Sequence, residues 1–137
     1  MKFISLVLVC CLGFFTSAFA DNRHIHPQAN GADKKATAKG AMGVGFCEIE
    51  ILNRSYDDIR VFGVFDDGTS MEPFSVYRYE GPHFIDLFYY GYCHAGMNLY
   101  INTFNGFPVY SGYIPVHSTV DLVPSFGKTL KAEIRAK

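Results

Sequence analysis

The pattern of apolar and polar positions changes near Val44. From there onward, short runs rich in Val, Ile, Phe and Tyr are interrupted by Gly, Asn, Asp or Pro about every 8–12 residues, a spacing typical of β-sandwiches and barrels. No apolar stripe with helical spacing persists along the chain, so we expect no substantial helix. The pattern predicts about eight strands, over Phe46–Leu52, Asp58–Phe65, Pro73–Tyr79, His83–Tyr90, Met97–Phe104, Phe107–Ile114, Ser118–Val123 and Lys128–Arg135.

The predicted fold class is all-β: an antiparallel β-sandwich of immunoglobulin-like size that occupies residues 44–137. Segment Asp58–Phe65 is apolar on both faces, as a central strand would be. The dipeptide Asn105-Gly106 between two apolar runs is a strong hairpin signal. The chain has no Trp, so the buried Trp of the immunoglobulin family is missing, and the prediction concerns an architecture rather than a family.

Residues 1–20 have the pattern of a secretory signal peptide. Lys2 precedes an almost uninterrupted apolar run over residues 3–15, and Ala18-Phe19-Ala20 matches the small-x-small pattern of a cleavage site before Asp21. The apolar run is short for a membrane span, which needs ~20 residues; an uncleaved anchor is the alternative. We therefore expect a secreted or periplasmic protein, cleaved between Ala20 and Asp21, with no membrane insertion once the leader is removed.

Residues 21–43 are predicted to form a flexible N-terminal linker. They are rich in Gly, Ala and Lys, with Ile25 as the one β-branched apolar residue, and therefore bury too little apolar area to offset the entropy of ordering. His24 and His26 lie in this stretch close to Asp21, and adventitious copper, nickel or zinc binding is the functional alternative. No closed set of ligands is visible, so we predict no metal site.

Two cysteines remain after the leader is removed. Cys10 and Cys11 leave with it, and Cys47 and Cys93 stay. In an exported protein, two cysteines most simply form a disulfide, and this one would close a long loop. A free or intermolecular thiol is the alternative. No Cys-x-x-Cys redox motif is present.

The predicted hairpin carries the candidate binding residues. A two-residue loop at Asn105-Gly106 pairs Phe104 with Phe107, Asn102 with Val109 and Tyr100 with Ser111, whereas a three-residue loop would exchange the two faces. One face then mixes aromatic and Asn side chains, and the other is continuously aliphatic and suits the core. The predicted binding residues are Tyr100, Asn102, Phe104, Phe107 and Tyr113.

Two other aromatic patterns bear on this hypothesis. The candidate rings could instead be covered by the linker or by a loop, because large exposed apolar patches are uncommon on monomers. A second cluster is predicted to belong to the core on the same grounds, and it comprises Phe84, Phe88, Tyr89, Tyr90 and Tyr92.

Catalytic and ion-binding motifs are scarce. The chain lacks Gly-x-Ser-x-Gly, His-Glu-x-x-His, a phosphate-binding loop and a dinucleotide fingerprint. A small hydrolase or metal-dependent enzyme would need His83, Asp86 and His94 within about 4 Å of one another. The acid pairs Asp57-Asp58 and Asp66-Asp67 are better explained as turns than as calcium ligands. We predict no catalytic residues, no metal and no cofactor.

Composition and the remaining motifs restrict the class of binding partner. Twelve Lys+Arg against thirteen Asp+Glu give a formal charge of −1, so no positive field exists to bind nucleic acid. Asn53-Arg54-Ser55 is a glycosylation acceptor, relevant if the host glycosylates exported proteins. An edge strand that captures an extended segment is a further possibility, although the charges of Lys128, Lys131, Arg135 and Lys137 would protect the last strand from such pairing. The favoured hypothesis is a non-enzymatic binding module for a protein or glycan.

Overall fold

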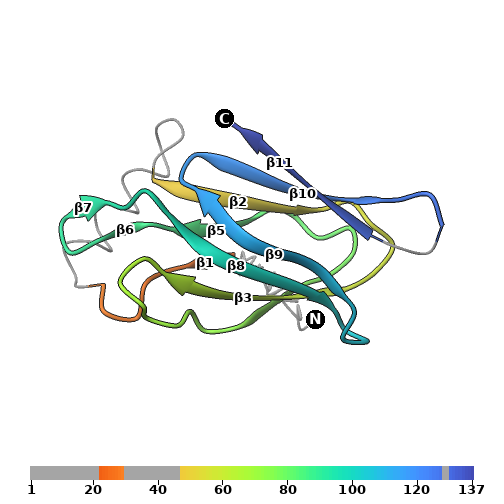
Figure 1. The fold of residues 1–137 in the computed structure, drawn as a ribbon, viewed down its shortest axis with the longest axis horizontal. Helices are drawn as coiled ribbons and strands as arrows, with labels where there is room; N and C mark the ends of the chain where they lie inside the picture. The colour runs from red at the N-terminus through yellow and green to blue at the C-terminus, as the bar shows by residue number, and fades with distance from the viewer. Residues whose placement is uncertain (1–21, 30–46, 128–129) are drawn as a thin grey trace, which may run out of the picture.

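The computed structural model describes residues 22–29, 47–127 and 130–137, and the regular secondary structure in these ranges is all β-strand (Figure 1). The strands are β1 (Arg23–His24), β2 (Glu48–Asn53), β3 (Ile59–Phe65), β4 (Phe74–Val76), β5 (His83–Asp86), β6 (Phe88–Tyr89), β7 (Tyr92–Cys93), β8 (Gly96–Thr103), β9 (Pro108–Pro115), β10 (Ser118–Pro124) and β11 (Leu130–Ala136).

Each of the eight predicted segments overlaps a strand, and one of them overlaps two. The segment predicted over His83–Tyr90 divides at Leu87 into β5 and β6. Leu87 is fully buried, its N–H donates to the Cys47 carbonyl at 2.7 Å, and its carbonyl accepts from the His94 N–H at 3.0 Å. Strands β1 and β7 were not predicted, because two residues are too few to show an alternating pattern.

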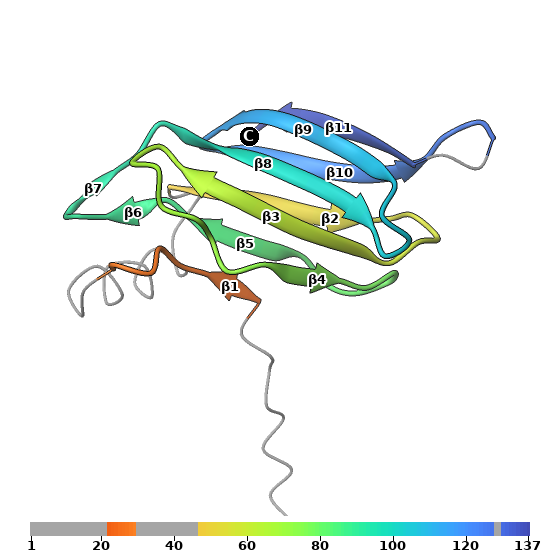
Figure 2. The same cartoon turned by 60° about the horizontal axis from the view of Figure 1, so that its bottom comes forward.

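The strands form sheets of five, four and two members (Figures 1 and 2). Their orders are β1-β5-β2-β10-β11, β4-β3-β8-β9 and β6-β7. The prediction of a purely antiparallel fold is wrong at two pairs, since β1 is parallel to β5 and β2 is parallel to β10. Alternation along one strand sets which face is buried but carries no information on the direction of its neighbour.

Alternating side chains of the two larger sheets contribute to one apolar core. In β2 the residues Ile49 and Ile51 are fully buried, while the intervening Glu50 is partly exposed. The predicted central position of β3 is correct, because it lies between β4 and β8. The fully buried core side chains of these two sheets include Ile49, Ile51, Ile59, Val61, Ile85, Met97, Leu99, Ile101, Ile114, Val120 and Leu122.

The N-terminal segment 22–29 packs against the domain, which corrects the linker prediction for these residues. Strand β1 pairs with β5 in register Arg23↔Phe84 and His24↔Ile85, and the Phe84 N–H donates to the Asn22 carbonyl at 2.8 Å. Composition did not reveal this docking, because the segment contributes histidine rings rather than aliphatic side chains to the contact. The predicted linker residues 30–43 lie outside the described residues.

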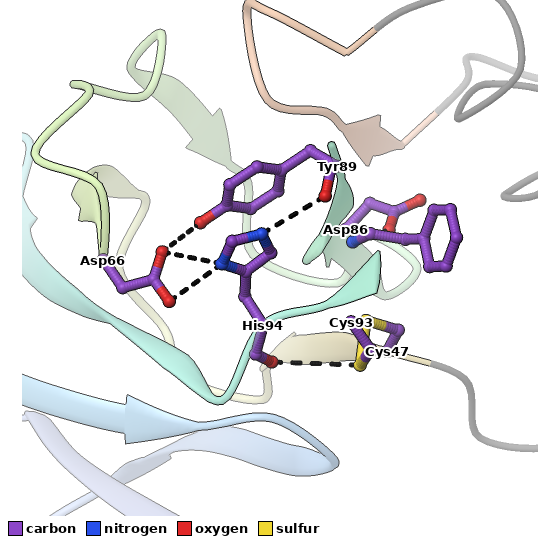
Figure 3. Close-up of a disulfide and its surroundings, with 7 residues drawn as sticks. Cys47, Asp66, Asp86, Tyr89, Cys93 and His94 are labelled. Atoms are coloured by element: carbon purple, nitrogen blue, oxygen red, sulfur yellow. Dashed lines mark hydrogen bonds and ion pairs between the residues drawn. A yellow bond between two sulfur atoms is a disulfide. The ribbon is translucent and has the colours of Figure 1, made fainter. Parts of the chain in front are cut away.

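The disulfide predicted between Cys47 and Cys93 has its sulfurs at bonding distance and its Cα atoms 5.5 Å apart (Figure 3). It connects the start of β2 to the end of β7 across a sequence separation of 46. A loop of that length corresponds to about 4 kcal/mol in the chain-entropy description.

The predicted leader and its cleavage position at Ala20 and Asp21 lie outside the described residues. Within the described part of the chain, no helix is long and apolar enough to cross a membrane.

Candidate ligand-binding face

The β8–β9 hairpin closes through a three-residue loop over residues 104–106. The Thr103 N–H donates to the Phe107 carbonyl at 2.9 Å, and the Gly106 N–H donates to the Thr103 carbonyl at 2.9 Å. Gly106 has φ 83°, in the left-handed region that the last residue of such a loop adopts. The predicted two-residue loop, with its pairing of Phe104 and Phe107, is therefore wrong.

A β-bulge offsets the longer loop. The register shifts between Ile101 and Asn102: Ile101 pairs with Tyr110, whereas Asn102 pairs with Pro108 and leaves Val109 as the extra residue. The predicted pairing of Asn102 with Val109 is consequently wrong. Beyond the bulge the register returns, so that Tyr100 pairs with Ser111 as predicted, and the two faces are not exchanged.

The candidate rings are exposed to solvent. The exposed fractions are 42% for Tyr100, 52% for Tyr113, 53% for Phe104 and 69% for Phe107, while Asn102 is half-buried. On the opposite side of β8, Met97, Leu99 and Ile101 are fully buried. The alternation of a single strand therefore separates a core face from a face that bears uncovered rings.

Strand β3 adds two side chains that the sequence analysis did not assign to this face. Arg60 is the register partner of Asn102, and Phe62 is the register partner of Tyr100. Both alternate with fully buried Ile59 and Val61, a signal that was present in the sequence but was hidden by the apolar Phe62. We call the solvent-side residues of this sheet the aromatic face: Arg60, Phe62, Val64, Asn98, Tyr100, Asn102, Ser111 and Tyr113.

Tyr113 lies across Gly96 on this face. A Cβ built on Gly96 would be 2.5 Å from the Tyr113 hydroxyl oxygen and 2.6 Å from its ring carbon. The missing side chain lets the Tyr113 ring lie close to the backbone of β8, a known device for covering a glycine in a sheet. Tyr113 is thus held in place and still presents half of its surface to solvent.

Two hollows flank the hairpin tip, which we define as residues 103–107. The smaller has a volume of about 240 Å³, and the ring of its Phe104 meets the Tyr77 ring edge-on at 5.9 Å between centroids. It is lined by Arg60, Phe62, Asn102, Thr103, Phe104 and Gly106. The larger has a volume of about 720 Å³ and is lined by Phe107 with Tyr56, Asp57, Pro108, Val109, Pro124, Leu130 and neighbouring residues.

The predicted binding residues are therefore distributed over three places. Asn102 and Phe104 line the smaller hollow, Phe107 lines the larger one, and Tyr100 and Tyr113 lie on the open sheet between β3 and the edge. Arg60 is the one charged member of the aromatic face, and it makes no ion pair with another described residue. Its guanidinium carbon lies 5.9 Å from the centroid of the Phe62 ring.

The three residues of the alternative enzyme hypothesis, His83, Asp86 and His94, contact different groups. His83 contacts His24 and Glu80, and His94 contacts Asp66, whereas the Asp86 carboxylate accepts from the Phe88 N–H at 2.8 Å. Among the described residues, no three His, Cys, Asp or Glu side chains are grouped so that they could hold a metal ion. His83, Asp86 and His94 thus have different partners in these contacts, and the convergence that the alternative enzyme hypothesis requires is not seen among them.

His94 instead belongs to a stack of rings beside the disulfide. The Tyr89 ring lies between His94, at 3.6 Å, and His26, at 4.0 Å, with all three rings nearly parallel. His94 Nδ1 lies 2.9 Å from an Asp66 carboxylate oxygen, and the Tyr89 hydroxyl donates to the same carboxylate (Figure 3). His26 pairs with Asp67 at 3.0 Å. The two acids of this turn, Asp66 and Asp67, therefore contact all three rings of the stack.

Burial and hydrogen bonding shift the pKa values in this stack. Burial, and then the hydrogen bond to Asp66, raises the pKa of Tyr89 far above its ordinary value. Burial opposes ionisation of Asp66, but the hydrogen bonds from Tyr89 and His94 hold the pKa of its carboxyl below the ordinary value.

The second aromatic cluster of the sequence analysis was predicted to belong to the core. This prediction holds for Tyr89 and is wrong for Tyr90 and Tyr92, which are exposed.

His24 and His26 have different partners from those a shared metal would need. The His24 ring lies parallel to Phe74 at 3.4 Å, and its Nε2 is 2.9 Å from Nδ1 of His83. Burial, and then repulsion from His83, lowers the pKa of His24 to about 4. His24 is thus neutral near pH 7 and is packed as an aromatic ring.

The glycosylation acceptor Asn53 is part of a buried turn. Its side-chain amide donates to the Asp57 carbonyl at 2.9 Å and to the Val76 carbonyl at 3.1 Å. Its Oδ1 accepts from the Ser55 hydroxyl at 2.6 Å, and Asn53 and Ser55 are both buried. The folded domain therefore presents no free amide for a glycan at this position.

Comparisons with known proteins supply no relative for this chain. No family model matches it, no curated protein matches it, and no solved structure matches it. Its function can therefore be inferred only from its own side chains.

Proposed function

We propose that this protein is an exported, non-enzymatic binding module that recognises a protein or glycan partner through the aromatic face and the hairpin tip. In this proposal the two larger sheets form a β-sandwich of immunoglobulin-like size, and the Cys47–Cys93 disulfide ties β7 of the small sheet to the start of β2 in the five-stranded sheet. The observation that carries it is the set of four exposed rings, Tyr100, Phe104, Phe107 and Tyr113, on one hairpin. Rigid aromatic side chains give contact area at low entropic cost, and they are enriched at recognition surfaces.

The docking of the N-terminal segment favours this function over simple burial of the rings. Segment 22–29 extends the five-stranded sheet beside β5, and its His24 packs on Phe74 of β4. Both contacts lie away from β8 and β9, which are at the opposite end of the four-stranded sheet from β4. The described part of the N-terminal segment therefore leaves the aromatic face open.

Export is supported by the leader pattern of residues 1–20 together with the disulfide pair, because disulfides persist in oxidising compartments. Cleavage before Asp21 would leave β1 intact, since it begins at Arg23. The test is the N-terminal mass of the protein recovered from the culture medium or periplasm. A chain that begins at Asp21 supports export, and a chain that keeps Met1 in the membrane fraction contradicts it.

The binding function is tested by the double substitution Tyr100→Ala with Phe104→Ala. The probes are an array of immobilised oligosaccharides and a displayed peptide library, both screened with the unsubstituted protein first. We expect the double variant to lose at least about tenfold in affinity for the selected ligand, while the free energy of unfolding changes by less than about 1 kcal/mol.

A matched control is Tyr79→Asn, which removes an exposed ring outside the aromatic face. Tyr79 has φ 62°, and Asn tolerates this backbone conformation. The control should bind like the unsubstituted protein. Full binding by the double variant would contradict the proposed surface, and a loss of stability beyond about 2 kcal/mol would show that the rings support the fold.

A further inference from the structure

The smaller hollow beside the hairpin tip combines one cation with neutral polar groups and rings. Arg60 contributes the cation, Asn102 an amide, and Thr103 a hydroxyl, while Phe62 and Phe104 contribute rings. No acidic side chain is among the described residues that line it. A site of this composition selects a ligand with a negative charge, further hydrogen-bonding groups and an apolar surface.

The cation in this hollow has no ion-pair partner in the part of the chain that the structure describes. Arg60 is exposed and makes no ion pair with any described residue, whereas the other strand arginines, Arg23 and Arg135, are both paired with carboxylates. The Arg60 guanidinium lies near the Phe62 ring, a contact that restricts its orientation. A guanidinium is a planar fork that matches one carboxylate through two parallel hydrogen bonds.

The rings and the size of the hollow restrict the rest of the ligand. Phe104 is braced by the edge of Tyr77, and Phe62 lies beside Tyr100 on the neighbouring strand. A volume of about 240 Å³ is smaller than the usual pocket for a drug-sized molecule, which starts near ~300 Å³, and it suits one ring with its substituents. The open sheet continues from the hollow through Tyr100 and Asn98, so a chain of such rings could extend along it.

We propose that this hollow binds a carboxylate-bearing sugar residue of an acidic glycan, with Arg60 paired to the carboxylate. Phe62 and Phe104 contact the apolar faces of the sugar ring, and Asn102 and Thr103 hydrogen-bond its hydroxyl groups. This inference rests on the proposed binding function and assigns its ligand class. A peptide carboxylate offers the same charge and its amides can also hydrogen-bond, but it does not combine an apolar ring face with a rim of hydroxyl groups, which is the combination that the rings, amide and hydroxyl of the hollow fit.

The experiment compares uronate oligosaccharides with their carboxyl-reduced counterparts. The full chain is expressed, and the folded product is titrated calorimetrically with hexasaccharides of hyaluronan, alginate and polygalacturonate. Each is matched by the same hexasaccharide with its carboxylates reduced to primary alcohols. We expect at least one acidic hexasaccharide to bind about tenfold or more tightly than its reduced form, because hydrogen bonds to charged groups are the strong ones.

The substitution Arg60→Gln should remove that preference by lowering affinity for the acidic form about tenfold, while leaving affinity for the reduced form unchanged. Arg60→Lys, which keeps the charge but loses the fork, should fall between the two. The control is Arg78→Gln, since Arg78 is exposed in the turn after β4 and its N–H, rather than its guanidinium, is bonded to Asp58. This control should bind both forms like the unsubstituted protein.

The outcomes separate this inference from the binding function. Equal affinity for acidic and reduced forms, lost in the Tyr100→Ala/Phe104→Ala variant, would overturn the carboxylate while leaving glycan binding intact. Binding of a C-terminal or acidic peptide but of no hexasaccharide would overturn the glycan class while leaving the surface intact. Acidic binding that survives in both Arg60→Gln and the double variant would overturn the site itself.

Discussion

The solvent-facing sides of the two larger sheets differ in composition: one carries paired charged side chains, and the other carries exposed aromatic rings. On the five-stranded sheet, Glu48 pairs with Arg23 at 3.3 Å and Glu50 pairs with Lys137 at 2.7 Å, while Arg23 lies over the Phe84 ring. We call these residues, with Thr119, the ion-paired face. On the four-stranded sheet, the aromatic face has Tyr100 and Tyr113 uncovered and one charge, Arg60, without an ion-pair partner among the described residues.

The two faces differ in whether their charged and apolar side chains are already in contact with other parts of the protein. The charged side chains of the ion-paired face pair with one another across β1, β2 and the C-terminal residue. The aromatic face leaves apolar surface and a cation exposed, although the same alternation in both sheets supplies an equally buried core beneath. Exposed apolar patches are uncommon on soluble monomers, and they mark interaction sites more often than structural ones.

The largest test of this comparison contrasts neighbouring residues of β8. Ile101→Ala should lower the free energy of unfolding by about 2–5 kcal/mol, because it leaves a cavity in the core. Tyr100→Ala, one residue away on the aromatic face, should change it by no more than about 1 kcal/mol. Chemical denaturation measures both. Equal losses would mean that the aromatic face supports the fold and is not spare for binding.

The second largest loss of stability is expected in the buried turn around Asn53, which connects β2 to β3. Asn53→Ala should cost about 1–3 kcal/mol, since it leaves the buried Val76 carbonyl, and the Asp57 carbonyl beside it, without their amide donor. The exposed Asn98→Ala is the matched control and should change stability by less than about 0.5 kcal/mol. The intact mass of protein from a glycosylating host should show no glycan at Asn53. A glycosylated, fully stable protein would contradict the structural role.

Acid should weaken the N-terminal contact that borders the ion-paired face. The pKa of His24 is about 4 in the folded state against an ordinary value of ~6.5, so between these values the unfolded chain binds more protons. The stability contributed by neutral His24 is therefore complete above pH ~6.5 and is lost as the pH falls toward ~4. Allowing for its partial exposure, the loss should be of order 1 kcal/mol.

His24→Phe keeps a ring against Phe74 but removes the titrating group, so its stability should fall less steeply over that pH interval. Denaturation midpoints at closely spaced pH values measure the slope, and His117→Asn, an exposed histidine with φ 61°, is the control. Asp66 and Asp67 have lowered pKa values in the folded state. Their contribution to stability is therefore lost at lower pH, as the pH falls below the ordinary pKa of an aspartate, and does not overlap with that of His24. Identical slopes in the His24→Phe and unsubstituted proteins would exclude His24 as the source.

The smallest effect concerns the ion-paired face itself. Removal of the Lys137–Glu50 pair by Glu50→Gln should cost about 0.2–1 kcal/mol, and this cost should diminish in high salt, because both side chains remain partly accessible to solvent and ion pairs there contribute little and are screened. Arg60→Gln on the aromatic face should have no measurable effect on stability, since Arg60 forms no ion pair with any residue that the structure describes. A larger loss for Arg60→Gln than for Glu50→Gln would reverse the comparison.

Part of the candidate site could be predicted from local pattern. A residue's face follows from its parity along the strand, so the exposure of Tyr100 and Tyr113 and the burial of Leu99 and Ile101 were accessible without coordinates. The loop length was predicted wrongly, and the faces nonetheless came out as expected because the bulge at Val109 compensates for the extra loop residue. A bulge depends on cross-strand pairing, which no single segment reveals.

Other parts required contacts between distant segments. Arg60 and Phe62 join the site because β3 pairs with β8, and Phe104 meets Tyr77 because the turn after β4 lies beside the hairpin tip. From the sequence, His26 was placed in a flexible linker and His94 was considered only for an alternative enzyme site, whereas the two rings stack on opposite sides of Tyr89. Ring stacks of this kind combine residues that are far apart along the chain and leave no periodic signal.

The sequence by itself therefore determined the all-β class, the strand segments, the cysteine pair and the inward or outward face of most strand residues, because each depends on alternation or composition over a few residues. Only the tertiary structure decided the parallel pairing of β2 with β10, the docking of residues 22–29 and the assembly of Arg60 with Phe104. Those features depend on which strands become neighbours, and that choice is made by the free energy of the whole core rather than by any local segment.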